Sequence, residues 1–281
     1  MTAIRARSWA GSAGFYLVIL VILLFSLFPF YWVLITSLKS NTELTQAVHG
    51  LWPDHASLNS YNQLFVAGNF LLPLANSVLV AAGATAIALV TGILTAYALV
   101  RLAQNARAAV LGFVLAIGFF PVIAMVGPLF FVYRNINFLN SYLSLIITYL
   151  IYAIPIGLWI LVSIFDEIPK EIEEAATVDG ATPLQVLRRI VLPLALPGVF
   201  TAAIISFILC WNDFVFALSF MSDPNRYTAP LAIVNLGQSK YQVFYNIIDA
   251  GVVATTLPIV ILVLIAQRRI VSGLAAGGLK G

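Results

Sequence analysis

Residues 8–38 read SWAGSAGFYLVILVILLFSLFPFYWVLITSL and contain no charged side chain. A helix needs about 20 residues to cross a hydrocarbon core of about 30 Å, so this stretch is long enough to span a membrane. Further stretches without charge follow along the chain, at residues 56–100, 108–133, 135–165, 190–212 and 250–267. The sequence therefore predicts an all-α, polytopic membrane protein.

The composition excludes a soluble globular protein. Of the 281 residues, 62% are hydrophobic and 9% are charged, whereas soluble domains carry about 25% charged residues. The formal charge of +3 requires no nucleic-acid partner, because membrane proteins gather lysine and arginine in their cytoplasmic loops. The single cysteine, Cys210, excludes an intramolecular disulfide. His49 and His55 are either a metal-binding pair or ordinary loop residues, and no third ligand is evident nearby.

Charges, prolines and glycines divide the chain into six predicted transmembrane helices, at residues 14–38, 75–100, 109–133, 142–165, 196–220 and 247–266. Ten lysines and arginines then lie on the side of the two termini and four on the other side, so we expect both termini in the cytoplasm. We also expect the first helix to remain as an uncleaved anchor, since no small-residue cleavage pattern follows it. The prediction is one transmembrane domain over residues 1–281.

Small residues and prolines mark the expected helix contacts and bends. A stripe on the second helix favours close packing in lipid and comprises Gly83, Ala84, Ile87, Ala88, Thr91, Gly92 and Thr95. Pro121 and Pro128 in the third helix, and Pro155 in the fourth, predict kinks. A static kink and a moving hinge are both compatible with this pattern.

The one large loop predicted on the cytoplasmic side covers residues 166–193. Pro169 suits the first turn of a helix, and the acidic residues just after it complement the helix dipole. Gly180 is placed to end this helix in a left-handed conformation. Thr182 can then cap a second short helix that begins at Pro183. The loop is therefore predicted to contain two short helices at an angle.

One side of the first loop helix is small and apolar and is flanked by Glu171 and Glu174. This side comprises Ile168, Ile172, Ala175, Ala176 and Asp179. Acidic residues would be repelled by anionic lipid headgroups, so the pattern suits a groove in another protein. A helix that merely connects two spans remains the alternative.

The segment Glu174-Ala-Ala-x-x-Asp-Gly-Ala181, followed by Ile190-x-Leu-Pro193 and Pro197, resembles the EAA loop of permease subunits of bacterial ATP-binding-cassette (ABC) importers. Leu187 stands where this pattern usually has Phe. The maltose-type carbohydrate branch is similar at Ala96-Tyr-Ala-Leu-Val-Arg101, at Phe120-Pro121 with Pro128-Leu-Phe130, and at Trp211-Asn-Asp-Phe214. The last fifteen residues resemble the end of the second, six-helix permease of such systems.

The resemblance implies a type I ABC importer permease fold and a non-catalytic subunit in a bacterial or archaeal cytoplasmic membrane. Its implied partners are a related permease, two ATPase subunits and an extracytoplasmic sugar-binding protein or lipoprotein. ATP and Mg²⁺ would be bound by the ATPase subunits, and this chain would hold no cofactor. It carries no Gly-x-x-x-x-Gly-Lys-[Ser/Thr] motif. The resemblance assigns the ATPase-coupling role to Glu174, Ala175, Ala176, Asp179 and Gly180.

The candidate substrate-pathway residues are Trp211, Asn212 and Asp213 in the predicted fifth helix. A carboxylate within a span is costly and usually faces a cavity or a partner. Asp and Asn can bond sugar hydroxyls, and Trp offers a flat apolar face. Alternatively, Asn212 and Asp213 hydrogen-bond to the partner permease and never contact sugar.

The predicted function is to form, with a second permease, the pathway for a di- or oligosaccharide or a glycoside. The sequence does not choose among maltodextrins, trehalose, sucrose, glycosylated osmolytes and glycerol phosphate esters. A secondary transporter or channel is the main alternative, but it would call for intramembrane coupling charges or an internal repeat. An intramembrane enzyme would need a catalytic set, and none is evident.

Overall fold

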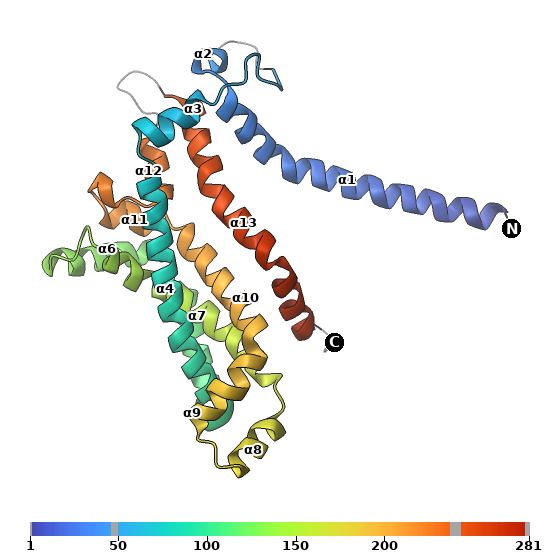
Figure 1. The fold of residues 1–281 in the computed structure, drawn as a ribbon, viewed down its shortest axis with the longest axis vertical. Coiled ribbons are helices and arrows are strands. Elements are labelled where there is room, and N and C mark those ends of the chain that lie inside the picture. Colours follow the sequence, from blue (N-terminus) through green and yellow to red (C-terminus); the bar gives the residue numbers. More distant parts are fainter. Residues whose placement is uncertain (1, 46–49, 237–242, 279–281) are drawn as a thin grey trace. The chain divides into compact units, whose positions relative to one another are not determined.

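The computed structural model describes residues 2–45, 50–236 and 243–278, and Figure 1 traces its helices. The α-helices are α1 (Thr2–Leu38), α2 (Asn41–Leu44), α3 (Asn59–Asn62), α4 (Leu71–Tyr97), α5 (Gln104–Gly118), α6 (Val122–Asn135), α7 (Tyr142–Asp166), α8 (Lys170–Val178), α9 (Pro183–Val186), α10 (Leu192–Trp211), α11 (Val215–Phe220), α12 (Ala229–Asn235) and α13 (Tyr245–Gly278). Short π-helical segments are η1 (Gln63–Ala67), η2 (Ala98–Leu102) and η3 (Leu187–Val191), and η4 (Pro224–Arg226) is a 3₁₀ turn. The predicted all-helical architecture is confirmed.

Five helices are long and apolar enough to cross a membrane by themselves in the described part of the chain. They cover Gly14–Leu38, Leu71–Leu102, Tyr142–Asp166, Pro183–Trp211 and Tyr245–Gln267. A sixth span arises if the bent pair α5 and α6 is counted as one. The chain is thus a multi-pass membrane protein, and each of these spans overlaps one of the six charge-free stretches of the sequence.

The chain forms two compact units, the first made of Met1–Phe70 and Ile233–Ala254 and the second of Leu71–Ala232 and Thr255–Gly281. In the first unit, the polar segment after α1 folds back onto the end of that helix. The Tyr31 hydroxyl donates to the carbonyl of Leu51 at 2.6 Å, and the hydroxyls of Ser37 and Tyr61 lie 2.8 Å apart. The described residues after the first span therefore contact the end of α1. Of the two histidines, His55 is exposed, and His49 lies outside the described residues.

The second unit is built on α4, α7 and α10, which lie side by side (Figure 1). Their facing sides carry the apolar core, which contains fully buried side chains such as Tyr149, Leu161 and Val80. Small residues allow the close approach. A Cβ added at Gly92 would lie 3.0 Å from Leu161 Cδ1, and one at Gly198 would lie 2.2 Å from Ile164 Cδ1. The predicted small-residue stripe thus packs through Ala84, Ala88 and Gly92, whereas Ile87 and Thr91 are exposed.

The third predicted span is not one helix. α5 and α6 meet at residues 119–121 with a bend of 86°, so the kink predicted at Pro121 is confirmed, but it is a break between two helices and not a bend within one helix over residues 109–133. Pro121 lacks the N–H that would continue α5 and disfavours helical angles at the residue before it, and it stands at the start of α6 with extended backbone angles (φ −60°, ψ 118°). Pro128 and Pro155, by contrast, lie inside α6 and α7 without ending them.

The fifth predicted span, residues 196–220, was also placed wrongly. α9, η3 and α10 follow one another from Pro183 to Trp211 and form a single apolar helix of 29 residues. The second loop helix is thus the beginning of the fifth span and not a separate element. Pro193 is tolerated because it lies at the start of α10, directly after the wider π-helical turn. The helix then stops at Asn212, and α11 begins only at Val215.

Candidate coupling loop and transport pathway

The loop helix α8 ends in a turn that requires glycine. Gly180 has φ +84°, as the sequence predicts. Its N–H donates to the carbonyl of Thr177 at 3.0 Å, and the N–H of Ala181 donates to the carbonyl of Ala176 at 3.0 Å. This pair of bonds is the Schellman motif, which satisfies carbonyls left free at a helix end. The turn therefore fixes the direction in which the chain leaves α8.

The next helix begins with a complete cap two residues later. The N–H of Gln185 donates to the Thr182 hydroxyl at 3.4 Å, and the Gln185 side chain accepts from the N–H of Thr182 at 2.8 Å. Pro183 occupies the first turn. The cap at Thr182 is thus confirmed, and the Thr-x-x-Gln spacing that encodes the reciprocal bond is readable in the sequence.

The inner side of α8 is anchored by a buried ion pair. Arg101 Nε donates to Glu173 Oε1 at 2.6 Å, and the side chains of the two residues are 10% and 9% exposed. Arg101 Nη2 also donates to the carbonyl oxygens of Phe165 and Ile168, at 3.0 and 2.8 Å. Sequence reasoning missed this pair, since it treated Glu173 only as an acidic residue of the first helical turn.

The predicted coupling residues lie mostly on the outer surface of this loop. Glu174, Ala175, Asp179 and Gly180 are exposed, whereas Ala176 is half-buried and packs against the core. Apolar side chains next to them are exposed as well: Ile172 by 43% and Val178 by 88%. Apolar groups outside the membrane spans gain from being covered, so this surface has the composition of a protein-binding site.

The candidate pathway residues lie where α10 stops. Asp213 Oδ2 accepts from the Tyr149 hydroxyl at 2.9 Å and from the N–H of Ala217 in α11 at 3.2 Å. The second bond satisfies one of the N–H groups that are free at a helix start. The side-chain amide of Asn212 donates to the carbonyl of Ile208 at 2.8 Å. Asp213 therefore has partners within its own chain.

Exposure separates the three pathway candidates. Asn212 is exposed and Asp213 is partly buried. Trp211 is 2% exposed, and its ring stacks on Phe207 at a centroid distance of 5.7 Å. The flat face expected to meet sugar is thus covered within this chain, while Asn212 offers its polar side chain at the helix break.

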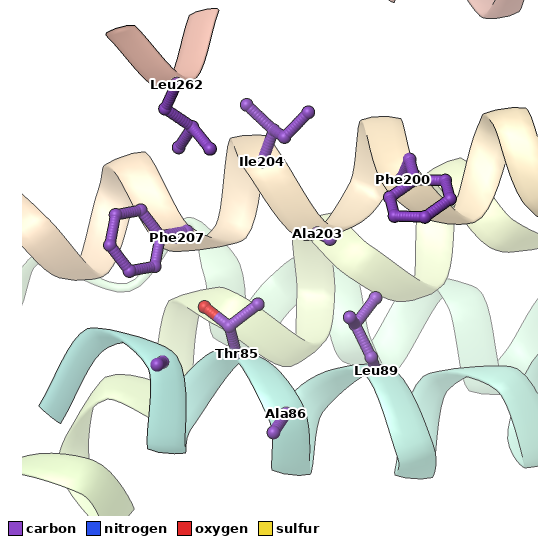
Figure 2. A pocket seen from close by; sticks show the side chains of 9 residues that line it. Thr85, Ala86, Leu89, Phe200, Ala203, Ile204, Phe207 and Leu262 are labelled. Atoms are coloured by element: carbon purple, nitrogen blue, oxygen red, sulfur yellow. The ribbon is translucent and has the colours of Figure 1, made fainter. Parts of the chain in front are cut away.

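An open cavity of about 330 Å³ lies between α4 and α10, with Leu262 of α13 at its edge (Figure 2). Its walls carry apolar side chains, among them Leu89, Phe200 and Phe207, and the hydroxyl oxygen of Thr85, which also lines it, is buried. A sugar needs several hydrogen-bond partners to replace water, so the substrate pathway is not placed here. In the described residues, no group of three or more His, Cys, Asp or Glu side chains could hold a metal ion.

Comparison with solved structures supports the fold. A chain of a bacterial ABC transporter involved in the import of the acidic polysaccharide alginate superposes with a TM-score of 0.77 over 92% of this chain and 95% of its own length, at 21% identity. A chain of the methionine ABC transporter MetNI matches with a TM-score of 0.58 over 76% of this chain and 97% of its own. The predicted type I importer permease fold is confirmed.

Comparison with proteins of known function gives the family. The sulfoquinovosyl glycerol transport system permease protein SmoH of Agrobacterium fabrum is 41% identical over 93% of this chain and 91% of its own length. The trehalose transport system permease protein SugB of Mycobacterium tuberculosis is 38% identical over the full length of both chains. The family model for binding-protein-dependent transport system inner membrane components matches residues 88–275. The family model and these full-length relatives show that the chain belongs to the family of binding-protein-dependent transport system inner membrane components.

Proposed function

We propose that this chain is one of two permease subunits of a carbohydrate importer and carries a di- or oligosaccharide or a glycoside. The observation that carries the proposal is the full-length similarity to permeases named for sugar transport, SmoH and SugB, and also to the trehalose/maltose permease MalG of Thermococcus litoralis at 34% identity over 91% of this chain. A channel or secondary transporter that works alone is not favoured by these relatives.

The proposed assembly contains a related permease, two ATPase subunits and an extracytoplasmic sugar-binding protein or lipoprotein. ATP and Mg²⁺ are bound by the ATPase subunits, and this chain is a non-catalytic subunit without a cofactor. The exposed side of α8, with Glu174, Ala175, Asp179 and Gly180, docks on an ATPase subunit. Ala176 lies at the inner edge of the same surface. Support comes from the exposure of these side chains next to apolar Ile172 and Val178.

The sugar passes the break between α10 and α11. Asn212 is the residue best placed to bond a hydroxyl, because its side chain is exposed. Asp213 contributes from a partly buried position, and Trp211 shapes the wall from below the surface. Both termini lie in the cytoplasm of a bacterial or archaeal cell, as the distribution of lysine and arginine indicates. All of residues 1–281 act as one transmembrane domain, with the coupling loop at residues 166–193.

The test is reconstitution of the complete complex in proteoliposomes with its binding protein. ATP hydrolysis and uptake are measured with trehalose, maltose, sucrose, a sulfoquinovosyl glycoside and glycerol 3-phosphate. Hydrolysis stimulated by one sugar-loaded binding protein, together with uptake of that sugar, is the expected result. Uptake that persists without ATPase subunits would favour the secondary transporter, and stimulation by a non-carbohydrate solute alone would refute the carbohydrate assignment.

A further inference from the structure

One guanidinium group joins three parts of the second unit at their cytoplasmic ends. Arg101 belongs to η2, the π-helical continuation of α4. It binds Glu173 of α8 and the carbonyls of Phe165 and Ile168, which lie at and just after the end of α7. Carbonyls at a helix end have no partner within the helix, so Arg101 caps α7 while it holds α8.

Chain connectivity makes this contact significant. α8 is linked covalently to α7 through residues 167–169 and to α9 and α10 through the turn at Gly180. The second span, Leu71–Leu102, has no such link to α8, because α5, α6 and α7 intervene in the sequence. The Arg101–Glu173 ion pair is a direct and strongly directional contact between α8 and this span.

Burial makes the contact stiff. Water screens surface ion pairs and leaves them weak, whereas both side chains here are about nine-tenths buried. Removing one partner of such a pair leaves an uncompensated buried charge, which is far more costly than removing both. The arrangement therefore resists separation of α8 from the end of the second span.

We propose that Arg101 and Glu173 form a rigid joint that transmits displacement of α8 to the second membrane span. The inference rests on the proposed coupling of α8 to an ATPase and extends it to two residues outside the EAA motif. Both are positioning residues: they contact neither substrate nor nucleotide. The joint makes α4 move together with α8 when ATP binding or hydrolysis displaces the coupling loop.

A matched control lies close by. Arg107 of α5 forms a two-bonded ion pair with Asp166 at the end of α7, in which Nη1 donates to Oδ1 at 2.8 Å. Like the Arg101–Glu173 pair, this pair joins an arginine to a carboxylate near the end of α7 on the same side of the protein. It differs because its side chains are about one-third exposed and it does not include α8. The variants Arg107→Gln and Asp166→Asn remove a comparable ion pair without opening the proposed joint.

The test measures the distance between α8 and the second span in the assembled complex. Cys210 is replaced by Ser, and spin labels are attached to cysteines at two exposed positions, Leu102 and Glu171. Pulsed electron paramagnetic resonance then measures the distance between the two labels in the nucleotide-free complex and in the complex trapped by ATP, Mg²⁺ and vanadate. Stimulation of ATP hydrolysis by trehalose-loaded binding protein is measured on the same variants without labels.

The wild-type joint is expected to give one narrow distance that is the same in both states. Arg101→Gln and Glu173→Gln should broaden it and reduce the stimulation of hydrolysis by at least about tenfold, because each leaves a buried group unpaired. The double variant should be no worse than either single one, since coupled residues are not additive. The two control variants should keep the narrow distance.

Two results would overturn the proposal: a wild-type distance that changes between the two states, or a sharp distance with full stimulation in Arg101→Gln. If a single variant fails to assemble, the double variant supplies the same readout without an unpaired buried charge. Trehalose failing to stimulate the wild-type complex would bear on the proposed substrate alone, because the label distance does not depend on sugar.

Discussion

Replacement of Gly180 by Val tests whether the geometry of the coupling loop matters. A Cβ at this position meets no atom within 4 Å, so the substitution introduces no clash. Its cost comes from the backbone alone, because φ is +84° and residues other than glycine disfavour backbone conformations with positive φ. The penalty for a left-handed residue is about 1–2 kcal/mol, which corresponds to about a five- to thirtyfold change in the population of the native turn.

Asn is the matched control at the same position. It tolerates a left-handed conformation better than other non-glycine residues, so Gly180→Asn should retain most activity, with Gly180→Ala between Asn and Val. The assay is ATP hydrolysis of the reconstituted complex with and without sugar-loaded binding protein. Uptake of the same sugar is measured in parallel. The Val variant should insert and pair with the second permease but lose the dependence of hydrolysis on the binding protein.

The order of the variants is the decisive observation. Equal loss in the Asn and Val variants would mean that the surface at residue 180, and not its backbone angle, is important. Normal coupling in the Val variant would leave the loop as a simple connector. A general loss of expression in all three would instead place Gly180 among residues needed for folding of the subunit.

Three further outcomes are expected. Glu174→Lys reverses an exposed charge on the docking side of α8, so urea should release ATPase subunits more easily from membranes that carry it; unchanged release argues against docking there. Asp213→Leu leaves the Tyr149 hydroxyl and the Ala217 N–H unpaired, so it should lower the stability of the subunit by about 1–3 kcal/mol. It should also lower sugar uptake more than Asp213→Asn does. Uptake equal to that of the wild type would remove the carboxylate from the pathway. Cysteines at exposed Ser57 and Asn225 should react only from the extracytoplasmic side; labelling from the cytoplasm would reverse the topology.

Much of the fold follows from the sequence because the membrane imposes simple rules. Stretches without charge identify the spans, since the hydrocarbon core accepts only long apolar helices. The turn at Gly180 and the cap at Thr182 are equally local, because each depends on a backbone preference or on a side chain three residues away. Features of this kind are encoded within a few residues and need no knowledge of the tertiary structure.

The features that sequence reasoning missed depend on contacts between distant segments. Nothing near Arg101 or Glu173 in the sequence shows that they meet across 72 positions. The helix break at Asn212 is hidden in the same way, because an apolar stretch surrounds it and the partner of the neighbouring Asp213, Tyr149, lies in α7. Proline gave an ambiguous signal: Pro121 separates two helices, whereas buried Pro155 lies within α7.

The continuity of the helix from Pro183 to Trp211 has a mechanical consequence. At 1.5 Å per residue its 29 residues extend about 43 Å. One end of this rod carries the turn at Gly180, and the other carries Asn212 and Asp213 at the break before α11. If the rod pivots about one end, each degree of tilt carries the far end about 0.75 Å at that length. A rocking of a few degrees at the loop would thus displace Asn212 by more than the length of a carbon–carbon bond. A tilt of this helix at the loop would therefore move the polar groups at its other end more than those near Pro183.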